Sequence, residues 1–94
     1  MRIDYDPAKN QANIEKHGIS FERLHEVDWS TAVFRLDERE DYGEIRFVGV
    51  CYIDDRLHYV CFTPRGDGSI MRVISLHKAN QRTADYYGQP RTLD

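Results

Sequence analysis

Basic side chains between residues 46 and 78 could hold a phosphate group. His77 and Lys78 join a β-rich run to a predicted helix, whose N-terminus can bind a phosphate. Arg46 and Arg72 lie in two separate β-rich runs, and a guanidinium group offers a phosphate two parallel hydrogen bonds. The alternative is that each arginine pairs with a carboxylate such as Glu44.

The strand register predicts that the two arginines converge. A two-residue turn at Asp54 and Asp55 places Arg46 opposite Thr63. A four-residue turn at 65–68 then places Arg72 opposite Cys61, one pair along on the same face. Two guanidinium groups from different strands would therefore meet on one side of the sheet.

This register divides the side chains between two faces. The face of the arginines also carries Tyr52 and Tyr59, whose rings could stack on bases. The apolar face, which would form the core, carries Phe47, Cys51, His58, Val60, Phe62 and Val73. A bulge at Gly49 would shift the alternation. Because Cys51 and Cys61 fall on opposite faces, no disulfide is expected between them.

Helix and strand signals predict the elements that must position these residues. A short strand at 2–5 precedes a helix that starts after Asp6, with Pro7 at its first position, and stops at Gly18. The other predicted elements are a short helix at 21–27, strands at 32–37, 44–53, 56–64 and 69–77, a helix at 78–87 and a frayed tail at 88–94. The predicted fold class is α+β: an antiparallel β-sheet meander with two N-terminal helices and one C-terminal helix, in a single domain over residues 1–94.

Length and charge limit the kind of protein. A chain of 94 residues makes one domain with a modest core. It has no apolar run of membrane-spanning length and no signal-peptide pattern, so we expect a cytoplasmic protein without a membrane partner. Residues 22–55 carry four basic and ten acidic side chains, whereas 56–94 carry six basic and three acidic ones. Opposite fields on two surfaces would suit a polyanion and a basic partner; the alternative is that these are solvated loops.

The helix that follows Asp6 is unusually polar. Lys9, Asn13 and Lys16 fall on one helical stripe, as do Asn10, Asn13 and His17. Such a stripe is typical either of a binding surface or of a hydrated outer face.

Familiar metal and cofactor motifs are missing from the sequence. No HxH, HExxH or CxxC spacing indicates a zinc site, and no P-loop or Rossmann glycine pattern indicates a nucleotide cofactor. We therefore predict no metal and no cofactor.

Two stretches of the sequence carry a resemblance: DYDPAKNQANIEKHGISF at 4–21 and MRVISLHKA at 71–79. Both resemble segments of the BrnT family of bacterial toxins, the ribonuclease halves of type II toxin–antitoxin pairs. The second motif of the family usually runs RxISxRKAxxxExxxY, and Arg72, Ser75, Lys78, Ala79 and Tyr87 (or the adjacent Tyr86) match it. His77 stands where the family tends to have Arg, and Thr83 where it tends to have Glu.

The resemblance implies a RelE-like fold and translation arrest by RNA cleavage. It also implies a BrnA-like ribbon-helix-helix antitoxin, through which alone the pair would contact operator DNA. RNA can be cleaved without a metal, by a base that removes the 2′-hydroxyl proton and an acid that protonates the leaving 5′-oxygen. In that reaction Arg46, Arg72 and Lys78 would stabilise the phosphorane, and His77 would act as acid or base, with His17 and Lys16 as secondary candidates. The RNA- or antitoxin-binding stripe would comprise Lys9, Asn10, Asn13, Lys16 and His17.

An alternative function follows from the two departures from the motif. His77 and Thr83 are also compatible with a catalytically weak or inactive toxin-like module that binds an antitoxin and tunes operon repression.

Overall fold

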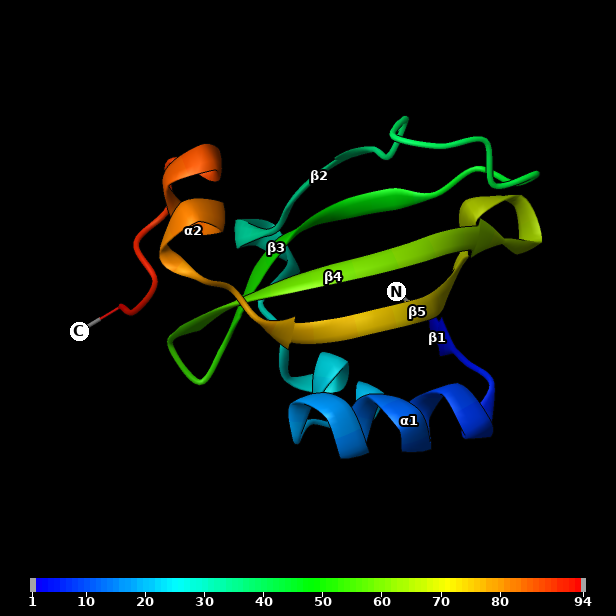
Figure 1. Ribbon diagram of the computed structural model, residues 1–94, viewed down its shortest axis with the longest axis horizontal. Helices are drawn as coiled ribbons and strands as arrows, with labels where there is room; N and C mark the ends of the chain where they lie inside the picture. Colours follow the sequence, from blue (N-terminus) through cyan, green and yellow to red (C-terminus); the bar gives the residue numbers. More distant parts are fainter. Residues whose placement is uncertain (1, 94) are drawn as a thin grey trace.

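The computed structural model describes residues 2–93 and contains a five-stranded sheet of order β1-β5-β4-β3-β2 (Figure 1). The strands are β1 (Arg2–Asp4), β2 (Val33–Leu36), β3 (Phe47–Ile53), β4 (Arg56–Arg65) and β5 (Ile70–Lys78). The α-helices are α1 (Pro7–His17) and α2 (Gln81–Tyr87), and the 3₁₀ helices are η1 (Phe21–Glu26), η2 (Trp29–Thr31) and η3 (Gly66–Gly68).

The α+β class is confirmed, but the predicted antiparallel meander and the predicted helices need correction. The sheet is mixed, because β1 pairs in parallel with β5 while β2 to β5 are antiparallel. Only α1 is an α-helix in the N-terminal part, since the second predicted helix is the 3₁₀ helix η1. The C-terminal helix starts at Gln81 because β5 continues to Lys78. A strand of three residues is too short for its sequence to predict which strand it pairs with. The parallel direction of β1 therefore depends on how α1 packs beside β5.

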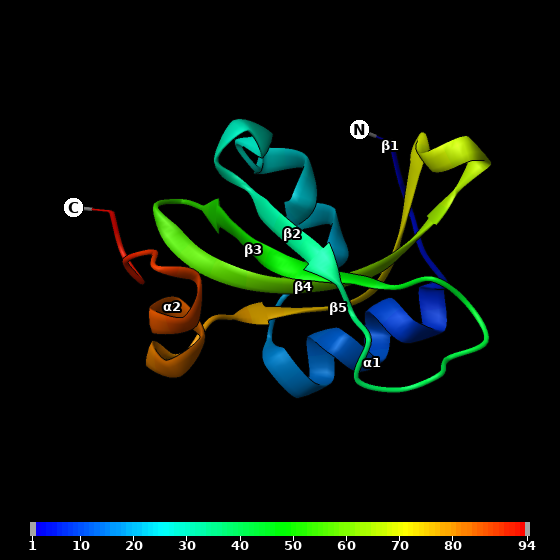
Figure 2. The ribbon, with the colours of Figure 1, turned by 90° about the horizontal axis from the view of Figure 1, so that it is seen from above.

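The signals that delimit α1 act as predicted. The side chain of Asp6 accepts a hydrogen bond from the backbone N–H of Ala8 at 2.9 Å, and Pro7 opens the helix. Gly18 ends it with a left-handed φ of 73°, and its N–H donates to the carbonyl of Ile14. Figures 1 and 2 both show α1 alongside β5, at the edge of the sheet.

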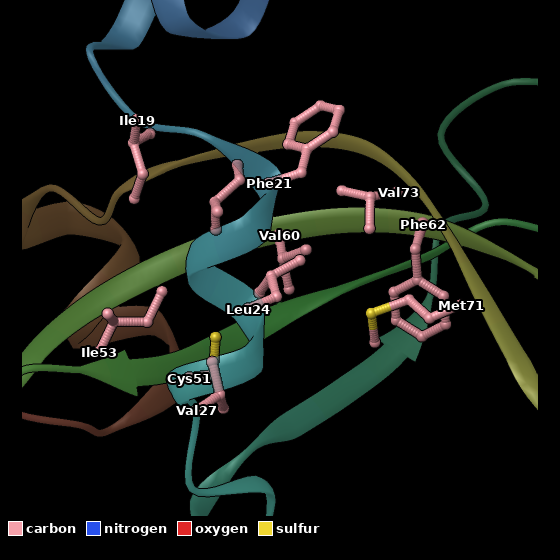
Figure 3. Packing of buried hydrophobic residues seen from close by; sticks show 11 residues of the cluster. Ile19, Phe21, Leu24, Val27, Cys51, Ile53, Val60, Phe62, Met71 and Val73 are labelled. Atoms are coloured by element: carbon pink, nitrogen blue, oxygen red, sulfur yellow. The ribbon is translucent and has the colours of Figure 1, made fainter. Parts of the chain in front are cut away.

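The main core lies between one side of the sheet and η1 (Figure 3). Phe21 and Leu24 of η1 are fully buried and face side chains of β3, β4 and β5. Burying a side chain of this size stabilises the fold by roughly 1.5–3 kcal/mol. The buried residues of the cluster are Ile19, Phe21, Leu24, Val27, Cys51, Ile53, Val60, Phe62, Met71, Val73 and Leu76.

The register prediction is correct for β3 and β4. Asp54 and Asp55 form the two-residue turn, both with positive φ, and Phe47 pairs with Phe62 as predicted. Gly49 sits in regular register, where a Cβ would lie 2.1 Å from the carbonyl oxygen of Val33. Glycine at this position therefore permits the close approach of β2 and is not a bulge.

The predicted register between β4 and β5 is wrong. The four-residue turn spans 66–69 rather than 65–68, so Arg72 pairs with Thr63 and not with Cys61. The bulge lies on β5 at Ile74, because Phe62 pairs with Val73 while Cys61 pairs with Ser75. The extra residue turns Val73 and Leu76 both toward the core.

The other side of the sheet, which we call the second face, is covered at one end by α2. Ala79 and Ala84 pack there in a smaller cluster with Val50, Tyr52 and Leu57. The loop from β2 to β3 lies toward the opposite end (Figure 2). Between α2 and this loop the second face carries the side chains analysed below.

The C-terminal segment is not frayed over the residues that the structure describes. The N–H of Leu57 donates to the carbonyl of Arg91 at 2.7 Å, and the hydroxyl of Tyr52 donates to the carbonyl of Pro90 at 2.7 Å. The N–H of Leu93 donates to Asp55. The expectation for residue 94, like that for residue 1, lies outside the described residues. No helix between residues 2 and 93 has the length and apolar character needed to cross a membrane.

Candidate active site

Arg46 and Arg72 share the second face, as the sequence predicted. Thr63 pairs with Arg72, and Arg46 directly precedes β3 at the position opposite Thr63. The three side chains line one groove together with Arg65. The two arginines therefore flank the same residue, Thr63, and lie one pair closer together than the predicted register placed them.

Each of these arginines is paired with a carboxylate. Arg72 Nη1 lies 2.6 Å from Asp4 Oδ2, and Arg46 Nε lies 3.2 Å from Glu44 Oε2. The alternative that Arg46 pairs with Glu44 is thus correct. The side chains of Arg46 and Arg72 are 27% and 34% exposed, and ion pairs at such positions contribute at most about 1 kcal/mol. A phosphate could therefore replace the carboxylates at little cost.

His77 lies between two other rings at the end of β5. Its ring centroid is 4.8 Å from that of His17, at the end of α1, and 5.4 Å from that of Tyr59 on β4. His77 Nδ1 is 2.9 Å from the carbonyl oxygen of Lys78. Partial desolvation, followed by the positive charges of His77 and Lys16, lowers the pKa of His17. Two imidazoles, one of them held neutral near pH 7, can exchange protons with one substrate.

The ring of His77 opens into a groove of about 340 Å³ between α2, β2 and β4, which we call the His77 groove. The guanidinium of Arg35 lies over the ring of Tyr86, with 4.7 Å from Cζ to the ring centroid. The groove is lined by Arg35, Arg39, Tyr59, His77, Arg82, Thr83, Tyr86 and Tyr87. Guanidinium groups beside aromatic rings can bind a phosphate and stack on a base.

A buried carboxylate fixes the loop that contributes Arg39. Asp37 accepts hydrogen bonds at 2.7 Å from both Nε and Nη2 of Arg39, and one at 3.0 Å from the hydroxyl of Tyr42. These bonds, led by those from Arg39, hold the pKa of Asp37 far below its ordinary value despite the burial of the carboxylate. Arg39 is thereby held at the edge of the His77 groove.

The four residues predicted to be catalytic do not form one cluster. Arg72 and His77 are five positions apart along β5, which corresponds to roughly 16 Å. Lys78 pairs with His58 on β4, and His58 pairs in turn with Cys51 on β3. Because Cys51 belongs to the main core, Lys78 projects on the core side of the sheet, opposite to His77. The structure brings Arg46 to Arg72 and His77 to His17, and separates these two pairs from each other and from Lys78.

The polar stripe of α1 is only partly on the surface. Asn13 is buried, and its amide pairs with both backbone groups of Leu76: Nδ2 donates to the carbonyl at 2.8 Å, and Oδ1 accepts from the N–H at 3.2 Å. Asn10 is half-buried, and its Oδ1 accepts from the N–H of Phe21 at 2.8 Å. The prediction of a binding surface is therefore wrong for Asn13, which secures α1 to the edge of β5. Lys9, Lys16 and His17 are exposed.

Sequence reasoning missed the arginines of the His77 groove. Arg35 pairs with Val48, which places it on the second face and could have been deduced from the alternation of β2. No comparable signal exists for Arg39 in a loop or for Arg82 on α2, because their positions depend on Asp37 and on the docking of α2.

The burial of His58 makes stability depend on pH. His58 is 4% exposed, as expected for a core histidine, and burial lowers its pKa from 6.5, with the charges of Arg56, Arg23 and Lys78 acting in the same direction. The hydrogen bond with the Arg56 carbonyl opposes this shift. The unfolded chain then binds more protons just below pH 6.5, so the free energy of unfolding should decrease as the pH falls through this range, by at most about 1.4 kcal/mol per pH unit.

Urea unfolding between about pH 7 and pH 5 measures this effect. His58→Gln should flatten the dependence, whereas the exposed control His25→Gln should leave it unchanged. An equally steep dependence in His58→Gln would show that another group is responsible.

Comparison with known proteins connects this geometry to a family. Among residues 2–93 no three His, Cys, Asp or Glu side chains are close enough together to hold a metal ion. No curated protein matches the chain. The family model described as the ribonuclease toxin, BrnT, of type II toxin–antitoxin systems matches residues 5–83. The chain, which presents paired histidines and an arginine-lined groove on one side of its sheet, therefore belongs to the BrnT family of ribonuclease toxins.

Proposed function

We propose that this protein cleaves RNA without a metal, at the second face of the sheet, with His17 and His77 as its acid–base pair. The observation that carries the proposal is the 4.8 Å contact between the two imidazole rings beside the His77 groove. One ring comes from α1 and the other from β5, so the fold maintains the pair independently of any local sequence motif.

The reaction is a transesterification within the RNA strand. His17, whose lowered pKa keeps it neutral near pH 7, accepts the proton of the ribose 2′-hydroxyl while the 2′-oxygen attacks the adjacent phosphorus. The bond to the 5′-oxygen breaks, and His77 donates a proton to this leaving group. The products are a 2′,3′-cyclic phosphate and a 5′-hydroxyl end.

Guanidinium groups stabilise the negative charge that develops on the phosphorane. Arg35, Arg39 and Arg82 line the groove that contains His77 and are the nearest candidates for this role. Arg46 and Arg72, roughly 16 Å along the sheet, bind another phosphate of the same strand once it displaces Glu44 and Asp4. Lys9 and Lys16 extend the positive surface along α1, where both are exposed.

The partner that neutralises the toxin would be an antitoxin protein, as the family implies. We propose a BrnA-like ribbon-helix-helix antitoxin that connects the complex to operator DNA, and translation arrest as the consequence of RNA cleavage in the cytoplasm. The acidic segment at 22–55 supports a basic partner surface.

Incubating the purified protein with an RNA oligonucleotide in excess EDTA tests the reaction. We expect undiminished cleavage, 2′,3′-cyclic phosphate ends, and no cleavage of the same sequence made with 2′-deoxyribose, because the attacking hydroxyl is then missing. Loss of activity with EDTA, or cleavage of the deoxy substrate, would contradict the mechanism.

A second candidate is an inactive module that only binds an antitoxin. The engagement of Arg46 and Arg72 by carboxylates favours it. A stable complex with the antitoxin and no cleavage of any RNA in the same assay would establish this function instead.

A further inference from the structure

We infer that a second phosphate-binding site of this protein lies at the end of β5 on the side opposite His77, in a groove that we call the Lys78 groove. This groove measures about 490 Å³ and is formed by the end of α1, η1, the β3–β4 turn and the end of β5. Its charged and titratable lining residues are His17, Arg23, Asp54, Arg56, His58 and Lys78. The inference rests on the proposed ribonuclease function, since it assigns the site to the RNA substrate.

The Lys78 groove has excess positive charge. Its single carboxylate, that of Asp54, is already 2.5 Å from Nη2 of Arg23. Within residues 2–93, no ion pair engages Arg56 or Lys78. Two cationic side chains from neighbouring strands thus face one groove without a counter-charge.

One donor of the Lys78 groove is also without a partner. Arg56 Nη2 donates to the carbonyl of Ala79 at 2.8 Å, which fixes the guanidinium, while Arg56 Nε is the one buried side-chain nitrogen or oxygen in the described residues that has no hydrogen-bond partner. A buried donor without an acceptor is unfavourable. Arg56 lines the groove, so an anion bound there would bring an acceptor to this guanidinium once a shift of the side chain exposes Nε. Burial is the main reason for the lowered pKa of His58, and the charges of Arg56, Arg23 and Lys78, which line the same groove, act in the same direction.

The position of His17 indicates which anion enters. His17 lines the Lys78 groove and its ring also contacts that of His77, so the groove adjoins the proposed catalytic pair. An RNA strand that is cleaved at this pair continues past the edge of β5, and each of its nucleotides brings one phosphodiester. We therefore assign the site to a phosphodiester next to the scissile one. This also accounts for Lys78, which lies on the wrong side of β5 to contact the same phosphate as His77.

Salt dependence of binding tests the assignment without any chemistry. Binding of 2′-O-methyl RNA, which cannot be cleaved through its 2′-oxygen, is measured by fluorescence anisotropy between about 50 and 200 mM salt. For single-stranded nucleic acid, each lost phosphate contact reduces the slope of log K against log salt by roughly 0.7. Lys78→Gln and Arg56→Gln should each show this reduction, and Arg56→Lys, which keeps the charge, should retain most of the slope.

Arg2→Gln is the matched control. It removes one positive charge at the opposite end of β5, where Arg2 pairs with Ile70, and should leave the slope unchanged. Circular dichroism verifies that each variant is folded, and Lys78, which is exposed, is the least disruptive position.

The possible outcomes separate this site from the proposed function. RNA binding and cleavage by the wild type, combined with an unchanged slope in Lys78→Gln, would overturn the Lys78 groove alone. An unchanged slope together with weakened antitoxin binding would assign the groove to the protein partner. A wild-type protein that neither binds nor cleaves RNA would overturn the proposed function and this site together.

Discussion

Replacing His77 with alanine is expected to reduce RNA cleavage by roughly 10²- to 10⁴-fold, the range typical for the loss of a general acid or base. His17→Ala should have an effect of similar size, because the rings are in contact and serve the same proton transfers. The double variant should lose little more than either single variant, since groups that act as a unit are not additive. Initial rates of cleavage of one labelled oligonucleotide measure all three.

The pH dependence distinguishes the two histidines. His17 must be neutral to accept a proton, and its lowered pKa places the acid limb of the rate profile below pH 6.5. This limb should disappear in His17→Ala. His25→Ala is the matched control, because His25 is exposed and its nearest carboxylate is that of Glu22 at 3.7 Å. Full activity in both His17→Ala and His77→Ala would remove the proposed catalytic pair.

Replacing Asn13 with alanine is expected to destabilise the protein by about 3 kcal/mol, the largest effect on folding that we predict. The substitution removes three hydrogen bonds, to the N–H and carbonyl of Leu76 and to the carbonyl of Ile19. All three backbone groups lose their partner, and an unsatisfied buried group costs about 1–3 kcal/mol. Urea unfolding measures the change in the free energy of unfolding.

Asn13→Asp refines this prediction. A carboxylate of the same shape still accepts from Leu76 but cannot donate to the two carbonyls, and it places a negative charge beside them. We therefore expect a loss of stability at least as large as that of Asn13→Ala. The exposed neighbour Gln11 provides the control, since Gln11→Ala should change stability by less than about 0.5 kcal/mol. A stable Asn13→Ala variant would mean that water molecules replace the hydrogen bonds that Asn13 makes to the backbone of Leu76 and Ile19.

Features set by neighbouring residues were predictable from the sequence. Asp6 and Gly18 delimit α1, and the turn at 54–55 fixes the pairing of β3 with β4. The alternation along β3 and β4 separated the core side, with Cys51 and Val60, from the arginine side. The shared face of Arg46 and Arg72 was correct although the register of β5 was wrong, because the error of two residues preserves the alternation.

The bulge at Ile74 was not predictable in the same way. Without it, Ser75 and His77 would point to the core side and Leu76 to the second face, as strict alternation from Arg72 requires. The bulge allows the apolar side chain of Leu76 to be buried in the core, but this gain exists only once β5 is paired with β4. That single residue places His77 on the same side as the arginines and sends Lys78 to the other.

The sequence by itself determined the family, the α+β class, the limits of α1 and the face that carries Arg46 and Arg72, because these depend on motifs and on backbone geometry within a few residues. Only the tertiary structure decided that β1 is parallel, that Asn13 is buried, and that His17 contacts His77 across 60 positions of the chain. A polar side chain can be buried only where a distant backbone satisfies it, and two imidazoles meet only where packing brings two separate elements together.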